Sequence, residues 1–491
     1  MTKVNIITTT LPKTYGGRTK SLLQRALLLN LSGVDVRLVT TNYRENYTAI
    51  YQDYYEKHNV LANTTFDNIY DHYQSQLTGE SVDWRDYLAQ QVGDIAGHTL
   101  VKRSEKFGRE YYYRNGIPKF MIKYHEPGKV HYFATYVDYH FEPTKFFFVN
   151  EQGYVHKIDH KDDNLDIIKQ EFVASSGTTY VTRHLNSQGS VTKIKLVGSE
   201  QEVVTFDNER DFFAYYYAEI FTENDVVIND ARALDYSLLK TNVKKRIFQL
   251  HNPHVDNPSV AIDTWKGSYK TLLTAPLDDS TAVVTLTEQQ KRDIIAKRSE
   301  LESHLVVIPH STHERELIYP KLGNRFVMVL RLHPQKNIAD AIQAFAIFHK
   351  NHPEYELDIY GEGELEDVLK QQVVALGLSN SVHFKGRTDD TDRAYQEADA
   401  LIVSSEFEGF GLNVLEAIAN GTPVITYPVK YGPTDIIDEK SGYVASERTP
   451  DALAAQMDNY VKAPKLREDV IERSKQFSEK HFVQKWLEII G

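Results

Sequence analysis

Residues 400–427 have the sequence ALIVSSEFEGFGLNVLEAIANGTPVITY. Ala400–Ser404 has the length and composition of a buried strand, Gly411–Asn420 has the apolar spacing of a helix, and Pro423–Tyr427 is a second buried strand. Two neighbouring strands that are joined by a crossover helix run parallel in one sheet. The stretch therefore predicts an α/β unit whose parallel sheet is covered by helices.

The same alternation extends toward the N-terminus as far as Arg325. Its further elements are the strands Phe326–Leu330, Glu356–Tyr360 and Val382–Lys385 and the helices Ala339–Lys350 and Leu365–Leu376. Alternation of this kind produces a doubly wound sheet. We expect one such domain over residues 321–470. A long helix over about 466–490 follows, and we expect residues 471–491 to pack back on the first half of the chain.

The N-terminal residues begin a second domain of the same kind. Strand Val4–Thr9, a Gly-Gly turn, a helix with an apolar stripe and strand Asp35–Thr41 follow one another. The alternation returns after residue 210, with four more buried strands: Asp225–Ile228, Arg246–Leu250, Ala282–Leu286 and Leu305–Ile308. We therefore predict an N-terminal α/β domain made of residues 1–78 and 210–320.

Residues 79–209 interrupt this domain with strands that no helices separate. The runs are rich in β-branched and aromatic residues and lie between turn sequences: Val130–Val137, Lys145–Val149, Tyr154–Ile158, Thr178–Arg183 and Val191–Val197. Strands that follow one another directly form antiparallel sheets. We therefore expect an antiparallel β-rich insertion in the N-terminal domain.

The composition excludes several classes of protein. The chain has no cysteine, so disulfides and thiolate chemistry are excluded. No run approaches the roughly 18 apolar residues of a membrane span, and the polar start is too short for a signal peptide. The cytoplasm is the expected compartment, with at most peripheral association with the inner face of the plasma membrane. A formal net charge of −12 argues against nucleic-acid binding.

One stretch departs from the acidic balance. Residues 102–129 contain eight basic residues (102, 103, 106, 109, 114, 119, 123 and 129) against three acidic ones, a net charge of +5, and four tyrosines lie among them. Taken alone, the pattern is typical of a solvated helix face followed by an exposed strand edge.

Two cations follow the first strand of the C-terminal domain. Arg331 comes directly after that strand and Lys336 lies five residues further on. Ligands of doubly wound sheets bind beyond the carboxyl ends of the strands. There the planar guanidinium of Arg331 and the ammonium of Lys336 could grip a diphosphate and offset the charge of a leaving group. A solvated loop with two surface cations is the alternative.

A second candidate is the stretch from Glu408 to Glu416 in the loop and helix after Ala400–Ser404. Gly409 and Gly411 let the backbone approach a ligand closely, and the helix that begins near Gly411 directs free N–H groups at an anion. Glu416, about one and a half turns into that helix, could accept hydrogen bonds from both hydroxyls of a ribose. A capped helix with two surface acids explains the stretch poorly, because capping does not need two glycines around an exposed Phe410.

The N-terminal domain offers two weaker candidates. Gly16 and Gly17 form a phosphate-loop-like turn after the first strand, although a simple tight turn explains them equally well. His251 follows a predicted strand and could be a metal ligand, a general base or a hydrogen-bond donor to a sugar hydroxyl. No further ligands at a known metal spacing lie near it. No Asp-x-Asp follows a strand in a setting that would hold Mg²⁺, since Asp162-Asp163 and Asp389-Asp390 lie in turn-like sequence. We therefore expect neither a metal nor another cofactor.

Together these residues resemble the C-terminal half of retaining glycosyltransferase family four. The matching elements are Arg331, Lys336, Tyr360–Gly363, Phe384–Arg387, the Glu408/Glu416 pair and the stretch from Glu416 to Pro423. The resemblance implies a GT-B fold, in which two Rossmann-like domains face a cleft and hold a nucleotide sugar without a metal. With its β-rich insertion, the whole chain looks like the bacterial poly(glycerol/ribitol-phosphate) α-glycosyltransferases of wall teichoic acid synthesis and their relatives that glycosylate serine-rich surface proteins.

The resemblance also implies roles for individual residues. Glu408 would orient the sugar, Glu416 would hold the ribose and His251 would contact the donor sugar. The residues implied in catalysis are His251, Arg331, Lys336 and Glu408. Those implied in donor binding are Gly16, Gly17, Arg331, Lys336, Lys385, Gly386, Glu408, Gly409, Phe410, Gly411, Leu412 and Glu416. The donor would be a UDP-sugar that carries glucose or N-acetylglucosamine, and the products would keep the α configuration.

The acceptor is expected to be a polyanionic teichoic acid polymer or, alternatively, the Ser/Thr residues of a serine-rich protein. The basic stretch 102–129 is the best candidate surface for a polymer, and the insertion is expected to support a homo-oligomer. A nucleotide-sugar epimerase on the same fold would have no use for such an insertion. A non-catalytic acceptor-binding subunit should have lost members of the donor site, whereas Arg331, Lys336, Glu408 and Glu416 are all present.

Overall fold

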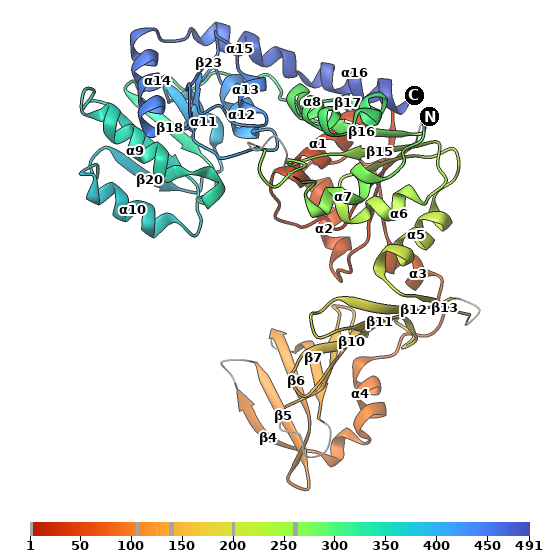
Figure 1. Cartoon of the computed structure of the whole chain (residues 1–491). Coiled ribbons are helices and arrows are strands. Elements are labelled where there is room, and N and C mark those ends of the chain that lie inside the picture. The colour runs from red at the N-terminus through yellow and green to blue at the C-terminus, as the bar shows by residue number, and fades with distance from the viewer. Residues whose placement is uncertain (1–2, 105–107, 127, 137–141, 199–201, 259–263) are drawn as a thin grey trace.

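The computed structural model describes all residues except 1–2, 105–107, 127, 137–141, 199–201 and 259–263. It contains two α/β lobes and a long antiparallel sheet that projects from one of them (Figure 1). We call these parts the N-lobe (residues 3–75, 209–308 and 479–490), the C-lobe (residues 325–477) and the insertion (residues 84–206).

The N-lobe is built on a parallel seven-stranded sheet in the order β17-β16-β15-β14-β1-β2-β3. Its strands are β1 (Lys3–Thr8), β2 (Asp35–Thr40), β3 (Thr65–Asn68), β14 (Val226–Asn229), β15 (Lys245–Gln249), β16 (Thr281–Thr285) and β17 (Leu305–Val307). Its helices are α1 (Gly17–Leu31), α2 (Tyr47–Glu56), α3 (Ile69–Ser75), α5 (Glu209–Ile220), α6 (Asp235–Leu239), α7 (Gly267–Thr274) and α8 (Glu288–Lys297).

The C-lobe has a parallel six-stranded sheet in the order β20-β19-β18-β21-β22-β23. Its strands are β18 (Arg325–Val329), β19 (Glu356–Tyr360), β20 (Val382–Gly386), β21 (Ala400–Val403), β22 (Val424–Thr426) and β23 (Gly442–Val444). Its helices are α9 (Ile338–His349), α10 (Glu366–Ala375), α11 (Thr391–Gln396), α12 (Leu412–Ala419), α13 (Pro433–Ile436) and α14 (Pro450–Lys462). Phe326 and Met328 pack into one apolar cluster and Val327 into another, so both faces of the sheet are covered.

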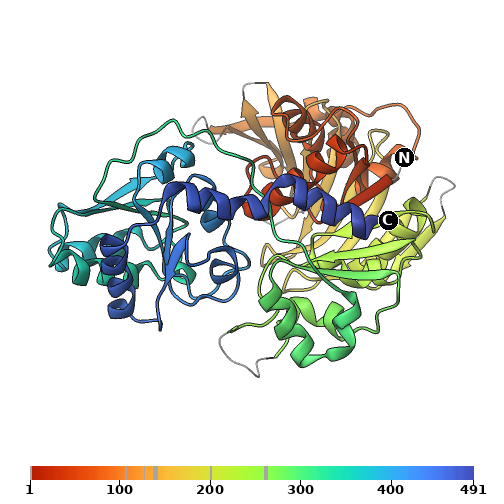
Figure 2. The ribbon, with the colours of Figure 1, turned by 90° about the horizontal axis from the view of Figure 1, so that it is seen from above.

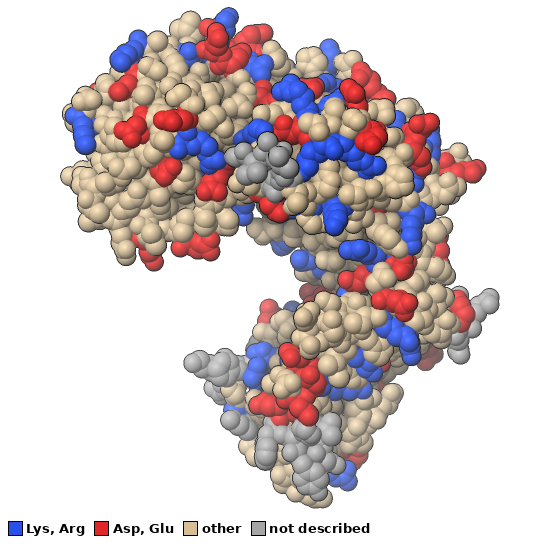
Figure 3. Space-filling model, viewed as in Figure 1, with Lys and Arg blue, Asp and Glu red and all other residues tan. Residues whose placement is uncertain are grey.

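The insertion is an antiparallel ten-stranded sheet whose strands pair in chain order, β4 to β13, with α4 (Trp84–Val92) against one face. The strands are β4 (Thr99–Ser104), β5 (Arg109–Arg114), β6 (Ile117–Glu126), β7 (Lys129–Thr135), β8 (Lys145–Val149), β9 (Val155–Lys161), β10 (Ile167–Val173), β11 (Thr179–Leu185), β12 (Val191–Val197) and β13 (Val203–Phe206). A wide notch separates the β4 end of this sheet from the C-lobe (Figure 3).

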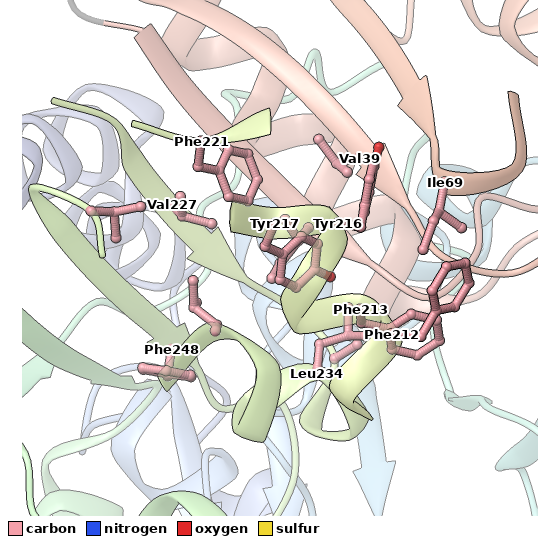
Figure 4. Close-up of a cluster of buried hydrophobic side chains, with 14 of the residues drawn as sticks. Val39, Ile69, Phe212, Phe213, Tyr216, Tyr217, Phe221, Val227, Leu234 and Phe248 are labelled. Carbon is pink, nitrogen blue, oxygen red and sulfur yellow. The ribbon is translucent and has the colours of Figure 1, made fainter. Parts of the chain in front are cut away.

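One continuous core joins the insertion to the N-lobe. Helix α5 follows β13 directly and buries Phe212, Phe213, Tyr216 and Tyr217 against the N-lobe sheet (Figure 4). Phe172, from β10, lies in the same cluster, together with residues of β11 to β13. The β13 end of the sheet is therefore anchored by the hydrophobic core of the lobe.

The chain crosses between the two lobes twice, and the crossings lie side by side. The amide of Thr312 donates to the carbonyl of Phe477 at 2.9 Å, and Thr312 forms a β-bridge with Ser478. After the second crossing, α16 (Glu479–Ile490) lies along the N-lobe (Figure 2).

The expectation of one long helix over 466–490 is wrong in one respect. The segment consists of α15 (Arg467–Ser474), a 3-10 turn η6 (Lys475–Phe477) and α16, and Ser478 lies in an extended conformation between η6 and α16. The helix is interrupted because its two halves pack into different hydrophobic cores. Phe477 packs in the C-lobe, whereas Phe482 and Trp486 pack in the N-lobe.

The expected helix face within residues 102–129 is also wrong. The described part of this stretch forms strands β4 to β7, and Arg103 on β4 pairs across the ladder with Glu110 on β5 at 2.6 Å. Consecutive tyrosines favour strands, which the charge count alone did not indicate. Glu105 and Lys106 lie outside the described residues, as does the side chain of Lys102. Within the described residues, no helix is long and apolar enough to cross a membrane.

Candidate active site

A pocket of about 280 Å³ lies between the two lobes, at the carboxyl ends of their parallel strands. The N-lobe contributes Gly17, Arg18, Ser21, His251 and Asn252, and His310 comes from the segment that follows β17 of this lobe. The C-lobe contributes Val329, Leu330, Arg331, Lys336 and the continuous segment Glu408–Asn413. The structure therefore brings together predicted residues from both halves of the chain, separated by as many as several hundred positions.

Lys336 and Glu408 form an ion pair at the base of this pocket. Nζ of Lys336 donates to Oε1 of Glu408 at 2.5 Å, and Oγ of Ser405 donates to the same oxygen at 2.6 Å. The hydroxyl of Ser404 donates to the carbonyl of Lys336, so the loops after β18 and β21 support one another. Glu408 is buried, and two hydrogen bonds hold its Oε1. Its second carboxylate oxygen therefore has a fixed position from which it can contact a ligand.

Arg331 is an exposed cation at the edge of the same pocket. Within the described part of the chain, its guanidinium has no ion-pair partner. The backbone beside it is tightly fixed, because a Cβ at Gly361 would lie 1.7 Å from the carbonyl oxygen of Leu330. Arg331 is therefore held at its base and remains available to an anion at its tip.

The loop from Glu408 to Gly411 leads into the N-terminus of α12, a helix end at which an anion could bind. Gly411 has φ +91° and no side chain with which to cap α12, and the first-turn amides of a helix have no acceptor within it. Gly409 brings the C-lobe backbone close to the N-lobe, since a Cβ there would lie 2.0 Å from the carbonyl oxygen of His251. Both glycines are needed for backbone geometry, as the sequence pattern indicated.

Phe410 is not exposed, contrary to the expectation from sequence. Its side chain is buried in the C-lobe core, with an edge-to-face contact to His310 at 5.3 Å between ring centroids. The aromatic ring thereby fixes the loop between the two glycines, while the backbone of Phe410 lines the pocket.

His251 is oriented by a buried carboxylate. Its Nε2 lies 2.5 Å from Oδ1 of Asp230, and Asp230 also pairs with Arg25. Burial lowers the pKa of His251, whereas Arg25 and His251 hold the pKa of the Asp230 carboxyl far below its usual value. The neutral imidazole therefore donates from Nε2 to an ionised Asp230. The His251 side chain lines the pocket. Its Nδ1 is buried without a hydrogen-bond partner in the described structure and is left as an acceptor.

Glu416 lies in an adjoining pocket of about 260 Å³, between α1 and α12. Its two oxygens contact Nζ of Lys20 at 2.8 Å and the hydroxyl of Tyr395 at 3.4 Å. Three predicted residues line neither of the two pockets: Gly16, Lys385 and Gly386. Gly16 precedes α1, and Lys385 pairs with Asp358 at 3.3 Å.

One group of side chains has the composition of a metal site, namely Glu356, Asp358 and His383. Arg325 already binds both acids, at 2.7 Å for Glu356 and 2.5 Å for Asp358. The group lies toward the amino ends of β19 and β20, away from Arg331. These side chains form an ion-pair network and line neither of the two pockets.

Sequence reasoning missed Arg25, Asp230 and His310, and each had a signal. Arg25 occupies the apolar stripe of α1, where an unpaired charge is costly. Asp230 and His310 each follow a buried strand of the N-lobe at its carboxyl end, where ligand-binding residues are expected.

Residues 312–477 match the protein family described as "Glycosyl transferases group 1". This part of the chain is a group 1 glycosyltransferase domain. Its boundaries enclose Arg331, Lys336, Glu408 and Glu416, and the chain is thus a glycosyltransferase.

Relatives extend over the whole chain. A poly(glycerol-phosphate) alpha-glucosyltransferase of Bacillus subtilis (strain 168) is 25% identical over 97% of this chain and 73% of its own length. A poly(ribitol-phosphate) alpha-N-acetylglucosaminyltransferase of Staphylococcus aureus (strain COL) is 23% identical over the full length of both chains. A UDP-N-acetylglucosamine–peptide N-acetylglucosaminyltransferase GtfA subunit of Streptococcus gordonii is 27% identical over 57% of this chain and 59% of its own.

The fold agrees with solved structures of such enzymes. The crystal structure of TarM superposes with a TM-score of 0.87 over 100% of this chain and 99% of its own, at 20% identity. A mutant of S. aureus TarM, crystallised with fondaparinux, alpha-GlcNAc-glycerol and UDP, gives a TM-score of 0.84 over both full chains. The predicted GT-B fold, with two Rossmann-like domains and an antiparallel insertion in the N-terminal domain, is confirmed.

Proposed function

We propose that this glycosyltransferase moves glucose or N-acetylglucosamine from a UDP-sugar to hydroxyls of a poly(glycerol-phosphate) or poly(ribitol-phosphate) polymer, with retention of the α configuration. The observation that supports it best is the convergence on one pocket of Arg331, the Lys336–Glu408 pair, the N-terminus of α12 and the His251 side chain. Cations and helix amides suit a diphosphate, and the buried polar atoms beside them suit a sugar.

In this proposal the donor diphosphate lies between Arg331, Lys336 and the first turn of α12. As the bond to the anomeric carbon breaks, negative charge grows on the departing diphosphate, and these groups are already in place to stabilise it. Electrostatic stabilisation by side chains and amides takes the role that a divalent cation has in other transferases, so turnover needs no metal. Glu416 would accept hydrogen bonds from the ribose hydroxyls in place of Lys20.

The sugar would be held by Glu408 and His251. Glu408 can accept a hydrogen bond through the oxygen that Lys336 does not occupy, and Nδ1 of His251 can accept one from a sugar hydroxyl. Among the described lining residues of the pocket, Glu408 is the one carboxylate, and its ion pair makes it a poor base. This supports attack of the acceptor hydroxyl from the face that the diphosphate leaves, with retention.

A basic and aromatic row on the insertion supports a polyanionic acceptor. Arg109, Lys123, Tyr132, Phe148 and Lys157 are paired neighbours across β5 to β9 and therefore share one face of the sheet. All five are half-buried, and Nζ of Lys157 lies 4.2 Å from the ring centroid of Phe148. Cations supported on aromatic rings form a surface that can bind successive phosphates, although the net charge of the chain is −12.

The insertion also supports an oligomer. Strand β4 is the edge of the ten-stranded sheet, and Leu100 and Val101 on it are exposed. An apolar edge strand is a template for pairing with a second copy. Several copies would present several basic rows to one repetitive polymer and raise avidity. Light scattering after size-exclusion chromatography tests this, with Val101→Lys expected to yield a smaller species.

The function is tested by incubating the protein with UDP-glucose or UDP-N-acetylglucosamine and measuring UDP release with three acceptors: a poly(glycerol-phosphate), a poly(ribitol-phosphate) and a serine-rich polypeptide. Acceptor-dependent release with a polymer is expected. Release with the polypeptide alone would favour the protein-glycosylating alternative, which the relationship to the GtfA subunit supports.

A further inference from the structure

A buried ion pair lies directly beneath the predicted donor pocket. Arg25 of α1 and Asp230, which follows β14, are paired through Nη2 and Oδ2, and their side chains are 2% and 0% exposed. The other carboxylate oxygen of Asp230 accepts from Nε2 of His251 at 2.5 Å. Asp230 therefore connects an interior arginine to the histidine that lines the pocket.

The last helix of the chain completes this arrangement. Trp486 on α16 is fully buried, and the guanidinium carbon of Arg25 lies 4.6 Å from the centroid of its ring. Nε of Arg25 is buried without a hydrogen-bond partner in the described structure, so the indole face is what lies against this part of the cation. The helix that carries Trp486 reaches the N-lobe only after crossing from the C-lobe at Ser478.

Stability alone is a weak reason for such an arrangement. Taking two charges out of water costs several kcal/mol per ion, which their attraction often only offsets. An apolar residue at position 25 would continue the buried stripe of α1 formed by Leu22, Ala26 and Leu29. What the pair provides instead is an ionised acceptor at a fixed place, to which His251 donates.

We propose that Arg25 and Trp486 are positioning residues, which act through Asp230 to keep the His251 imidazole with Nε2–H on the carboxylate and with Nδ1 in the donor pocket. The chain terminus thus helps to shape the sugar site of the other lobe. The inference rests on the proposed function for the role of His251 in turnover, but the orientation and ionisation of the ring can be tested separately.

The electrostatics of the site predict opposite effects for the two members of the ion pair. Burial has the largest influence on the pKa of His251 and lowers it, as do Arg25 and Arg232. Asp230 raises the pKa of His251. The ring of His310 stacks on that of His251, with 6.0 Å between the ring centroids. His310 stays neutral, because burial lowers its pKa to about 3. Removing the Arg25 charge should therefore raise the pKa of His251, and removing the Asp230 charge should lower it further.

The first experiment compares Arg25→Gln and Asp230→Asn by the pH dependence of kcat/KM for UDP-sugar hydrolysis without acceptor. The acid limb, on which His251 gains a proton and Nδ1 ceases to accept, should move to higher pH in R25Q and to lower pH in D230N. Both variants should also lose about 10²-fold in kcat/KM, because the ring is no longer held in place. Parallel loss of activity without these opposite shifts would mean a structural role only.

The second experiment needs no turnover. The pH dependence of the His251 ring resonances, followed by NMR of protein with isotope-labelled histidine and assigned with His251→Gln, reports its ionisation directly. The midpoints should again move in opposite directions in R25Q and D230N. If no donor is hydrolysed but the midpoints move, the proposed function fails and the inference stands. If hydrolysis is normal in the native protein and the midpoints coincide, the inference alone is overturned.

Trp486 is tested with a matched control on the same helix. Trp486→Phe keeps an aromatic face over Arg25, and we expect it to retain most activity. Trp486→Leu should reduce kcat/KM for UDP-sugar hydrolysis about tenfold and move the acid limb of its pH profile. Phe482→Leu removes a neighbouring ring from the same core and should lower the melting temperature comparably without moving that limb. Identical pH profiles for W486L and F482L would reduce Trp486 to a packing residue.

Discussion

Lys20 and Glu416 link the two lobes across the cleft, with Nζ of Lys20 2.8 Å from Oε1 of Glu416. Lys20 lies on α1 of the N-lobe and Glu416 on α12 of the C-lobe. The carboxylate expected to accept the ribose hydroxyls is therefore already occupied by a cation. Nucleotide binding would have to replace this contact.

The first prediction follows from that competition. Lys20→Met should bind UDP up to about fivefold more tightly, since an exposed ion pair contributes at most about 1 kcal/mol. Titration calorimetry with UDP measures the change. Lys13→Met removes another exposed lysine of the N-lobe, paired at 3.8 Å with Asp53, and should leave the affinity unchanged. Weaker binding by K20M would indicate that Lys20 contacts the nucleotide itself.

The second prediction concerns the cations of the pocket. Arg331→Ala and Lys336→Met should each reduce turnover by about 10²-fold or more, the size of effect seen when an electrostatic stabiliser is removed. Lys336→Met should also lower the melting temperature, because it leaves Glu408 buried without its cation. Lys385→Ala is the matched control: Lys385 pairs with Asp358, outside the pocket, and its removal should preserve turnover. Equal losses of turnover in all three variants would refute the assignment of Arg331 and Lys336 to the diphosphate.

The third prediction is that turnover needs no divalent cation. Dialysis against EDTA should change the initial rate by less than about twofold, since Arg331, Lys336 and the α12 amides supply the positive charge. Strong inhibition that Mg²⁺ or Mn²⁺ reverses would contradict the proposal. Measuring the rate over a range of ionic strength controls for a general salt effect on polymer binding.

The fourth prediction concerns stereochemistry. An α-linked UDP-sugar should yield an α-linked product, because the one lining carboxylate of the described pocket is paired with Lys336 and is therefore a poor base for activating a hydroxyl on the opposite face. The anomeric coupling constant in the proton NMR spectrum of a glycosylated short acceptor decides the matter. A β linkage would exclude retention.

The fifth prediction concerns the acceptor. Reversing the charge at Lys123 and Lys157, on the basic and aromatic row of the insertion, should raise the apparent KM for a polyol-phosphate polymer and leave donor hydrolysis almost unchanged. The effect should weaken with salt, because interactions between charges at the protein surface are screened beyond about 10 Å at 0.1 M ionic strength. The control reverses Lys193 and Lys195, exposed residues of β12 at the other end of the same sheet. Equal polymer kinetics in both double variants would exclude the row from the acceptor site.

The sequence by itself determined the α/β class, the antiparallel insertion and most strand positions. Buried strands and amphipathic helices are local patterns with periods of two and 3.6 residues, and the glycine requirement at Gly411, which has φ +91°, is also local. For the same reason Arg331, Lys336, Glu408 and Glu416 could be recognised from their places after strands.

Only the tertiary structure decided which side chains meet. The contacts Lys20–Glu416, Trp486–Arg25 and Arg25–Asp230 each join residues about two hundred or more positions apart, and Asp230 in turn contacts His251. No periodicity records such pairs, because they depend on how the lobes and the last helix pack. The break at Ser478 and the strands within residues 102–129 were likewise set by the cores and ladders that these segments join.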